Sequence, residues 1–115
     1  MTRRQSATAA ALADPAVVTK AYDLLAVVAR AGFRVQYGTL AKALGSPWTS
    51  RNLGPLLDAV AARCAERGEP SLDSLVLNAR TGRPGAGWSG RDPEGEQRRC
   101  HHHHVAIPPT TEENP

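Results

Sequence analysis

The chain has 115 residues, with 14 Lys and Arg against 11 Asp and Glu, and a formal net charge of +3. This length allows one domain of roughly 100–200 residues, and no apolar run approaches the ~20 residues of a membrane span. Two cysteines are too few for a disulfide framework, and the amino terminus is too weakly apolar for a signal peptide. We therefore expect a cytoplasmic protein whose small positive charge suits a DNA partner but does not demand one.

Composition divides the chain into three parts. Residues 1–13 and 91–115 are poor in large apolar side chains, and such segments cannot offset the conformational entropy that folding removes. We expect a flexible amino-terminal arm over residues 1–13, a folded domain over residues 14–90 and a disordered carboxy-terminal tail over residues 91–115.

The first predicted helix runs from Pro15 to Ala31. Asp14 is a strong N-cap, and a proline at the first helical position gives up an amide that has no partner there. Gly32 stands where a left-handed residue commonly ends a helix. Between these signals, apolar residues recur at the spacings of three and four that indicate an amphipathic helix. They are Val17, Val18, Ala21, Leu24, Leu25 and Val28.

Two further helices are predicted after a short extended segment from Phe33 to Tyr37, in which apolar and polar residues alternate. A short helix covers Thr39 to Leu44 and is stopped by Gly45. A longer helix is expected from about Arg51 to Arg67. Pro55 should lie in or just past its first turn, because a proline deeper in a helix removes a hydrogen bond.

A β-hairpin is predicted to complete the domain. Leu75-Val76-Leu77 is typical of a buried strand, Thr81-Gly82-Arg83-Pro84-Gly85 of a turn, and Ala86-Gly87-Trp88 of the returning strand. A short helix, a tight connection, a longer helix and a hairpin follow one another in the order of a winged helix-turn-helix. The predicted fold class is mainly α, with three helices, a β-hairpin wing and disordered termini.

Part of this domain is similar to a known family. Val35-Gln-Tyr-Gly-Thr-Leu-Ala-Lys-Ala-Leu-Gly45 resembles the Thr-Tyr-Gly-x-Leu-Ala motif of the alkylguanine-DNA alkyltransferases and their alkyltransferase-like relatives. Ser50-Arg51-Asn52-Leu53-Gly54 resembles the Arg-Ala-Val-Gly segment at the head of their recognition helix. Leu75-Val76 is similar to the strand that enters their Pro-Cys-His-Arg motif, and Gly87-Trp88-Ser89-Gly90 to their Asn-Tyr-Ser-Gly loop.

The resemblance implies a winged-helix DNA-binding domain with particular contacts. Tyr37 would press on a backbone phosphate, and Arg51 would enter the duplex and hold the space of an extruded base. The family's nucleophilic Cys falls near Asn78 and its activating His near Ala79, so the groups that perform alkyl transfer are missing. Arg80 falls where the motif has its Arg. Recognition of modified or flipped bases is retained as a hypothesis.

The candidate DNA-contacting residues lie in the helix-turn-helix and the wing. They are Tyr37, Lys42, Arg51, Asn52, Arg80, Arg83 and Trp88. Wing arginines commonly reach flanking phosphates or the minor groove. Structural alternatives stay open: Tyr37 and Trp88 could belong to the core, and the arginines could be ordinary solvated side chains.

The string Cys100-His101-His102-His103-His104 contains ligand types that suit zinc, nickel or copper. It has no second Cys/His pair elsewhere, since Cys64 falls on an apolar helix face. We interpret Cys64 as a small core residue and the string as part of the tail, and predict no metal site and no cofactor. Whether the string binds metal in the cell stays open.

We predict a non-enzymatic DNA-binding protein of the alkyltransferase-like, winged-helix type, acting in DNA repair or targeting a DNA-processing system. Its expected partner is double-stranded DNA, with no membrane and no small-molecule substrate. The alternative is a protein-interaction adaptor that uses the same helical surface. A third hypothesis, a repair enzyme, is disfavoured by Asn78 and Ala79.

Overall fold

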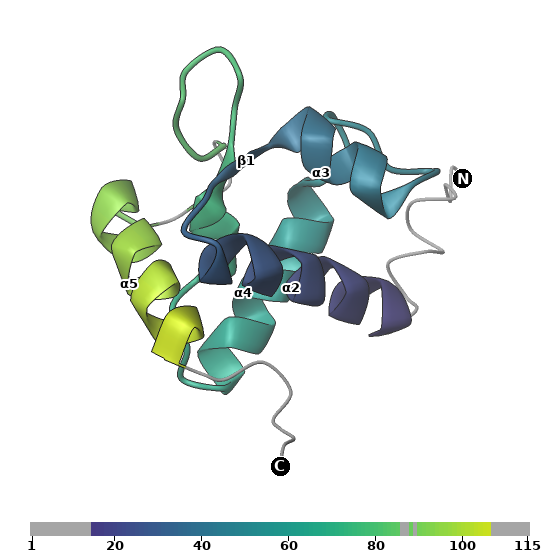
Figure 1. Cartoon of the computed structure of the whole chain (residues 1–115). Coiled ribbons are helices and arrows are strands. Elements are labelled where there is room, and N and C mark those ends of the chain that lie inside the picture. Colours follow the sequence, from purple (N-terminus) through teal and green to yellow (C-terminus); the bar gives the residue numbers. More distant parts are fainter. Residues whose placement is uncertain (1–14, 86–87, 89, 107–115) are drawn as a thin grey trace.

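The computed structural model describes residues 15–85, 88 and 90–106, so the predicted arm over residues 1–13 and the end of the predicted tail lie outside it. The described part is mainly helical, as the sequence predicts (Figure 1). Its elements in chain order are α2 (Pro15–Arg30), β1 (Val35–Gln36), α3 (Tyr37–Leu44), α4 (Gly54–Glu66), the 3₁₀ helix η1 (Leu72–Leu75), β2 (Val76–Leu77) and α5 (Pro93–Ala106).

Helix α2 has nearly the predicted bounds and presents one face to the core. The side chains of Val18, Ala21, Tyr22, Leu25 and Ala29 are buried along it, at the three- and four-residue spacing of the sequence pattern. Past its carboxyl end, Gly32 adopts a φ of +77°, and its N–H donates to the carbonyl of Ala29 at 3.0 Å. A left-handed glycine thus ends the helix where the sequence predicts.

The other two predicted helices are confirmed with different starting points. Helix α3 begins at Tyr37, two residues before the expected start. Helix α4 begins at Gly54 rather than near Arg51, which corrects the prediction: Arg51 lies in the turn that precedes the helix. The reason is Pro55, whose ring and missing N–H are tolerated only in the first turn.

The segment formed by η1 and β2 occupies the centre of the protein. Leu72, Ser74, Leu75 and Val76 have no exposed surface, and η1 packs against α2, α4 and α5. The predicted strand over Leu75-Val76-Leu77 is wrong at Leu75, which belongs to η1. A 3₁₀ turn directs consecutive side chains to several sides, whereas a strand would alternate between two.

Strand β2 pairs in parallel with β1, with Val35 opposite Val76 and Gln36 opposite Leu77. The predicted hairpin is reduced, among the described residues, to one antiparallel bridge between Leu77 and Pro84. This bridge closes a loop over residues 78–83 that projects from the helical body (Figure 1). Of the expected returning strand, residues 86 and 87 lie outside the described part, and Trp88 is not in a strand.

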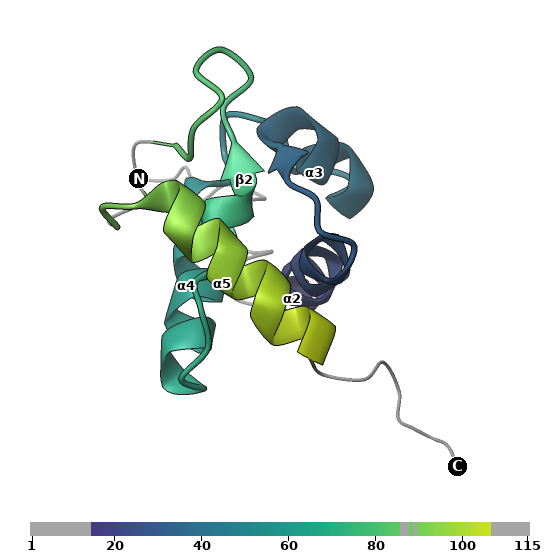
Figure 2. The ribbon, with the colours of Figure 1, turned by 60° about the vertical axis from the view of Figure 1, so that its left-hand side comes forward.

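Helix α5 corrects the prediction that residues 91–115 form a disordered tail. Residues 93–106 are helical and pack against α2 and η1, and Figure 2 shows α5 lying across this face of the molecule. Asp92 caps the helix, because its Oδ1 accepts the N–H of Gly95 at 3.0 Å. Beyond the first turn, the buried stripe is formed by Gln97, Cys100 and His104. These residues are polar or small, so an apolar pattern does not reveal it.

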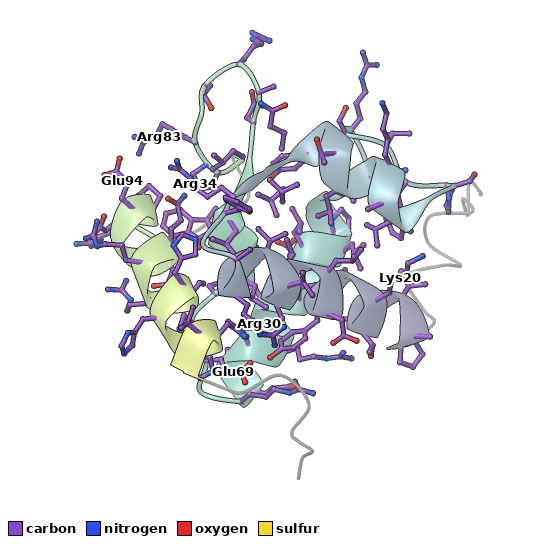
Figure 3. All side chains as sticks on the ribbon, viewed as in Figure 1. Lys20, Arg30, Arg34, Glu69, Arg83 and Glu94 are labelled. Atoms are coloured by element: carbon purple, nitrogen blue, oxygen red, sulfur yellow. The ribbon has the colours of Figure 1, made fainter. Side chains whose placement is uncertain are left out.

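The carboxyl end of α5 holds a buried imidazole. His104 is 3% exposed and makes an edge-to-face contact with the Tyr22 ring on α2 at 6.4 Å between centroids. Burial, followed by repulsion from His103 and from Arg30, lowers the pKa of His104, and Glu69 opposes this shift. Figure 3 shows Arg30 and Glu69 beside the last turns of α5. His104 is therefore neutral in the folded protein at pH 7.

We expect the protein to lose stability as the pH falls through the range in which an unfolded histidine takes up a proton. The pKa of His104 is lowered from its usual 6.5, so below that pH the unfolded chain binds a proton that the folded state does not. In urea denaturation from pH 7.5 to 5.5, His104→Leu should show a weaker decline in unfolding free energy than the wild type. Equal declines would contradict a buried neutral His104.

Candidate functional site

A pocket of about 610 Å³ lies where β1 leads into α3 and where the loop after β2 begins. The parallel pairing explains this convergence. Gln36 and Leu77 are opposite one another, so the next residues along each strand, Tyr37 and Asn78, leave the sheet at the same end. The connection before α4 supplies the remaining wall. The lining residues are Gln36, Tyr37, Gly38, Ser50, Arg51, Asn78, Ala79, Arg80 and Gly85.

The lining of the pocket is positively charged and polar. It contains two arginines, and no carboxylate, thiol or imidazole is among the described residues that form it. Neither Arg51 nor Arg80 forms an ion pair within the described part of the chain, and both are exposed. The pocket therefore suits an anionic or hydrogen-bonding ligand.

Tyr37 connects the first turn of α3 to the loop after β2. Its side chain is half-buried, and burial is the main cause of its raised pKa, opposed by a backbone hydrogen bond from Gly85. A Cβ on Gly85 would overlap the Tyr37 hydroxyl, so glycine is needed for this approach. The phenol is consequently protonated at neutral pH and lies at the wall of the pocket.

Arg51 is carried by a turn that Asn52 holds together. The Asn52 Oδ1 accepts the N–H of Thr49 at 2.8 Å, and its Nδ2 donates to the carbonyl of Pro47 at 2.9 Å. Asn52 is half-buried and does not line the pocket. These contacts give Asn52 a structural role, whereas the sequence analysis predicted that it contacts DNA.

Asn78 organises the loop that carries Arg80. Its Oδ1 accepts the N–H of Arg80 at 2.8 Å, and its N–H donates to the carbonyl of Arg83 at 2.8 Å. The adjacent Ala79 adds no functional group. Asn78 was missed as a site residue, although asparagine side chains commonly bond to the backbone two residues later and so form turns.

Of the seven predicted DNA-contacting residues, Tyr37, Arg51 and Arg80 line the pocket, and the other four do not. Lys42 is exposed on α3, and Arg83 is exposed on the projecting loop (Figure 3). Trp88 is half-buried and lines a separate pocket of about 320 Å³ beside the start of α5. The pocket is also lined by Gln36, Ser50 and Gly85, which the sequence did not single out as site residues.

Both cysteines are buried thiols. Burial raises the pKa of Cys64, and it raises the pKa of Cys100 to about 12, where a hydrogen bond with Ser74 opposes the shift. Cys64 has no exposed surface, as predicted for a core residue. In the described part of the chain, no three His, Cys, Asp or Glu side chains are grouped as metal ligands would be.

Within residues that the structure describes, no helix is long and apolar enough to span a membrane. Comparisons with protein-family models, with curated proteins and with solved structures gave no significant match to this chain.

Replacing Asn52 tests whether this side chain is structural. Asn52→Ala removes its side-chain hydrogen bonds to Thr49 and Pro47, and we expect the unfolding free energy to fall by about 1–3 kcal/mol, since each bond contributes roughly 0.5–1.5 kcal/mol. Ser50→Ala, a change at an exposed position in the same connection, should stay within about 0.5 kcal/mol of the wild type. Urea denaturation measures both. Wild-type stability of Asn52→Ala would show that the turn does not depend on it.

Proposed function

We propose that this chain is a non-enzymatic DNA-binding protein of the alkyltransferase-like, winged-helix type. In this proposal α3, the connection after it and α4 form the helix-turn-helix, and the loop over residues 78–83 serves as the wing. The observation that carries the proposal is the pocket between these parts, whose described lining holds no carboxylate and includes Tyr37, Arg51 and Arg80. Arginine and tyrosine side chains are common donors to backbone phosphates.

The pocket also supports recognition of an extruded or modified base. Its volume of about 610 Å³ falls in the range of small-ligand pockets, and Arg51 stands at its edge in the turn before α4. A base that leaves the duplex needs such a recess and a side chain that holds its place in the stack. With Asn78 and Ala79 in the positions of the family's Cys and His, we propose binding without alkyl transfer.

A protein-interaction adaptor is the alternative, and one feature favours it. An apolar groove of about 390 Å³ runs along the outer side of α2, where Val27 is 57% exposed. The two hypotheses differ in their dependence on salt. Phosphate contacts release counterions, so DNA affinity should fall steeply as salt concentration rises.

Binding of fluorescent duplexes, measured by anisotropy over a range of NaCl concentrations, tests the proposal. The duplexes are plain, mismatched or carry an alkylated base, and Arg51→Ala should weaken binding by roughly 1–3 kcal/mol with little change in melting temperature. The matched control is Arg67→Ala, because Arg67 lies at the opposite end of α4. That variant should bind as the wild type does. Wild-type affinity of a folded Arg51→Ala for every duplex would favour the adaptor.

A further inference from the structure

Three exposed arginines in the pocket wall and the loop beside it share one local contact. In each case a side-chain oxygen two residues earlier in the chain accepts the arginine's own backbone N–H. Thr49 Oγ1 accepts the N–H of Arg51 at 3.2 Å, and Asn78 Oδ1 accepts that of Arg80 at 2.8 Å. Thr81 Oγ1 accepts that of Arg83 at 3.2 Å. The sequence thus repeats an Asn- or Thr-x-Arg unit three times around the projecting loop and the connection before α4.

These turns order the backbone while leaving the guanidinium groups available. Side-chain-to-backbone bonds of this kind fix turns that would otherwise sample many conformations. The ion pairs in the described part of the chain involve Arg99 and His103 and none of the three arginines. These contacts therefore fix the backbone from which each arginine side chain extends, and they do not involve its charged group.

Both loops are also fastened at a second point. The connection that carries Arg51 is held by the bond between Asn52 and the carbonyl of Pro47. The loop that carries Arg80 and Arg83 is closed by the bridge between Leu77 and Pro84. Flexible loops would lose conformational freedom on binding, which weakens affinity, whereas loops ordered beforehand avoid most of that loss.

We propose that Thr49, Asn78 and Thr81 are positioning residues, which order the three arginines in advance for the phosphodiester groups of a DNA backbone. This inference rests on the proposed function and deepens it, because it assigns the ordering of the site to side chains that need not touch DNA. A guanidinium presents a planar pair of N–H donors that matches a phosphate, so its direction matters as well as its charge.

Thr49 and Thr81 give the cleanest test, since neither lines the pocket. Thr49→Val and Thr81→Val keep the shape of the side chain and every charge but remove the acceptor. Each should weaken binding to a plain duplex about three- to tenfold, the loss expected when one side chain must be ordered on binding. The Ser variants retain the oxygen and should restore wild-type affinity.

The salt dependence separates positioning from contact. Arg83→Ala should reduce the slope of log affinity against log salt by about 1, because a phosphate contact is lost. The Val variants should keep the wild-type slope, because the arginine still reaches its phosphate. Thr19→Val is the matched control: Thr19 also accepts from an arginine, the Nη1 of Arg63 at 2.8 Å, but it lies on α2.

Two results would overturn the inference in distinguishable ways. If the wild-type protein binds duplex DNA and both folded Val variants bind equally well, the threonines do not position the arginines, and the proposed function stands. If the wild-type protein shows no salt-dependent binding to any duplex, the proposed function fails and this inference fails with it. Melting temperatures of each variant establish that it is folded.

Discussion

The segment from Ser71 to Leu75 runs through the interior, where its backbone groups cannot reach water and must find partners within the protein. Helix α5 supplies them. Glu96 accepts the N–H of Ser71 at 2.6 Å, Gln97 donates to the carbonyl of Ser74 at 2.9 Å, and the Cys100 thiol donates to the carbonyl of Ser71 at 3.3 Å. An unpaired buried group would cost about 1–3 kcal/mol, so these contacts explain why a polar helix is part of the core.

The position of the candidate site follows from this constraint. The central segment, once fixed, places β2 beside β1, and their parallel register brings the start of α3 next to the loop that begins at Asn78. Tyr37 then meets Gly85 across the gap between the two. The arginines occupy loops rather than helices, and their placement depends on side-chain contacts to the backbone. The framework and the charged loops are thus separate parts with separate stabilising interactions.

The sequence predicted those elements whose signals are local. Apolar periodicity and a terminal glycine located α2 and α3, and Pro55 explains the later start of α4. Helix α5 was missed because its buried face consists of Gln97, Cys100 and His104, although Asp92-Pro93 repeats the cap-and-proline signal of Asp14-Pro15. The walls of the pocket come from segments far apart in the chain. Tyr37, Arg51 and Arg80 were predicted as contacts from the sequence, whereas their convergence on one pocket follows from the strand pairing and the connection before α4.

Replacing Gln97 by methionine tests most directly whether hydrogen bonds to the central segment hold α5 in place. Gln97 is 5% exposed, and Gln97→Met keeps its size while leaving the carbonyl of Ser74 without its partner. In urea denaturation at pH 7.5, we expect the unfolding free energy to fall by about 1–3 kcal/mol, with exposed Gln36→Met unchanged as the control. If apolar burial alone docked the helix, Gln97→Met would be as stable as the wild type or more so, and that result would contradict this account.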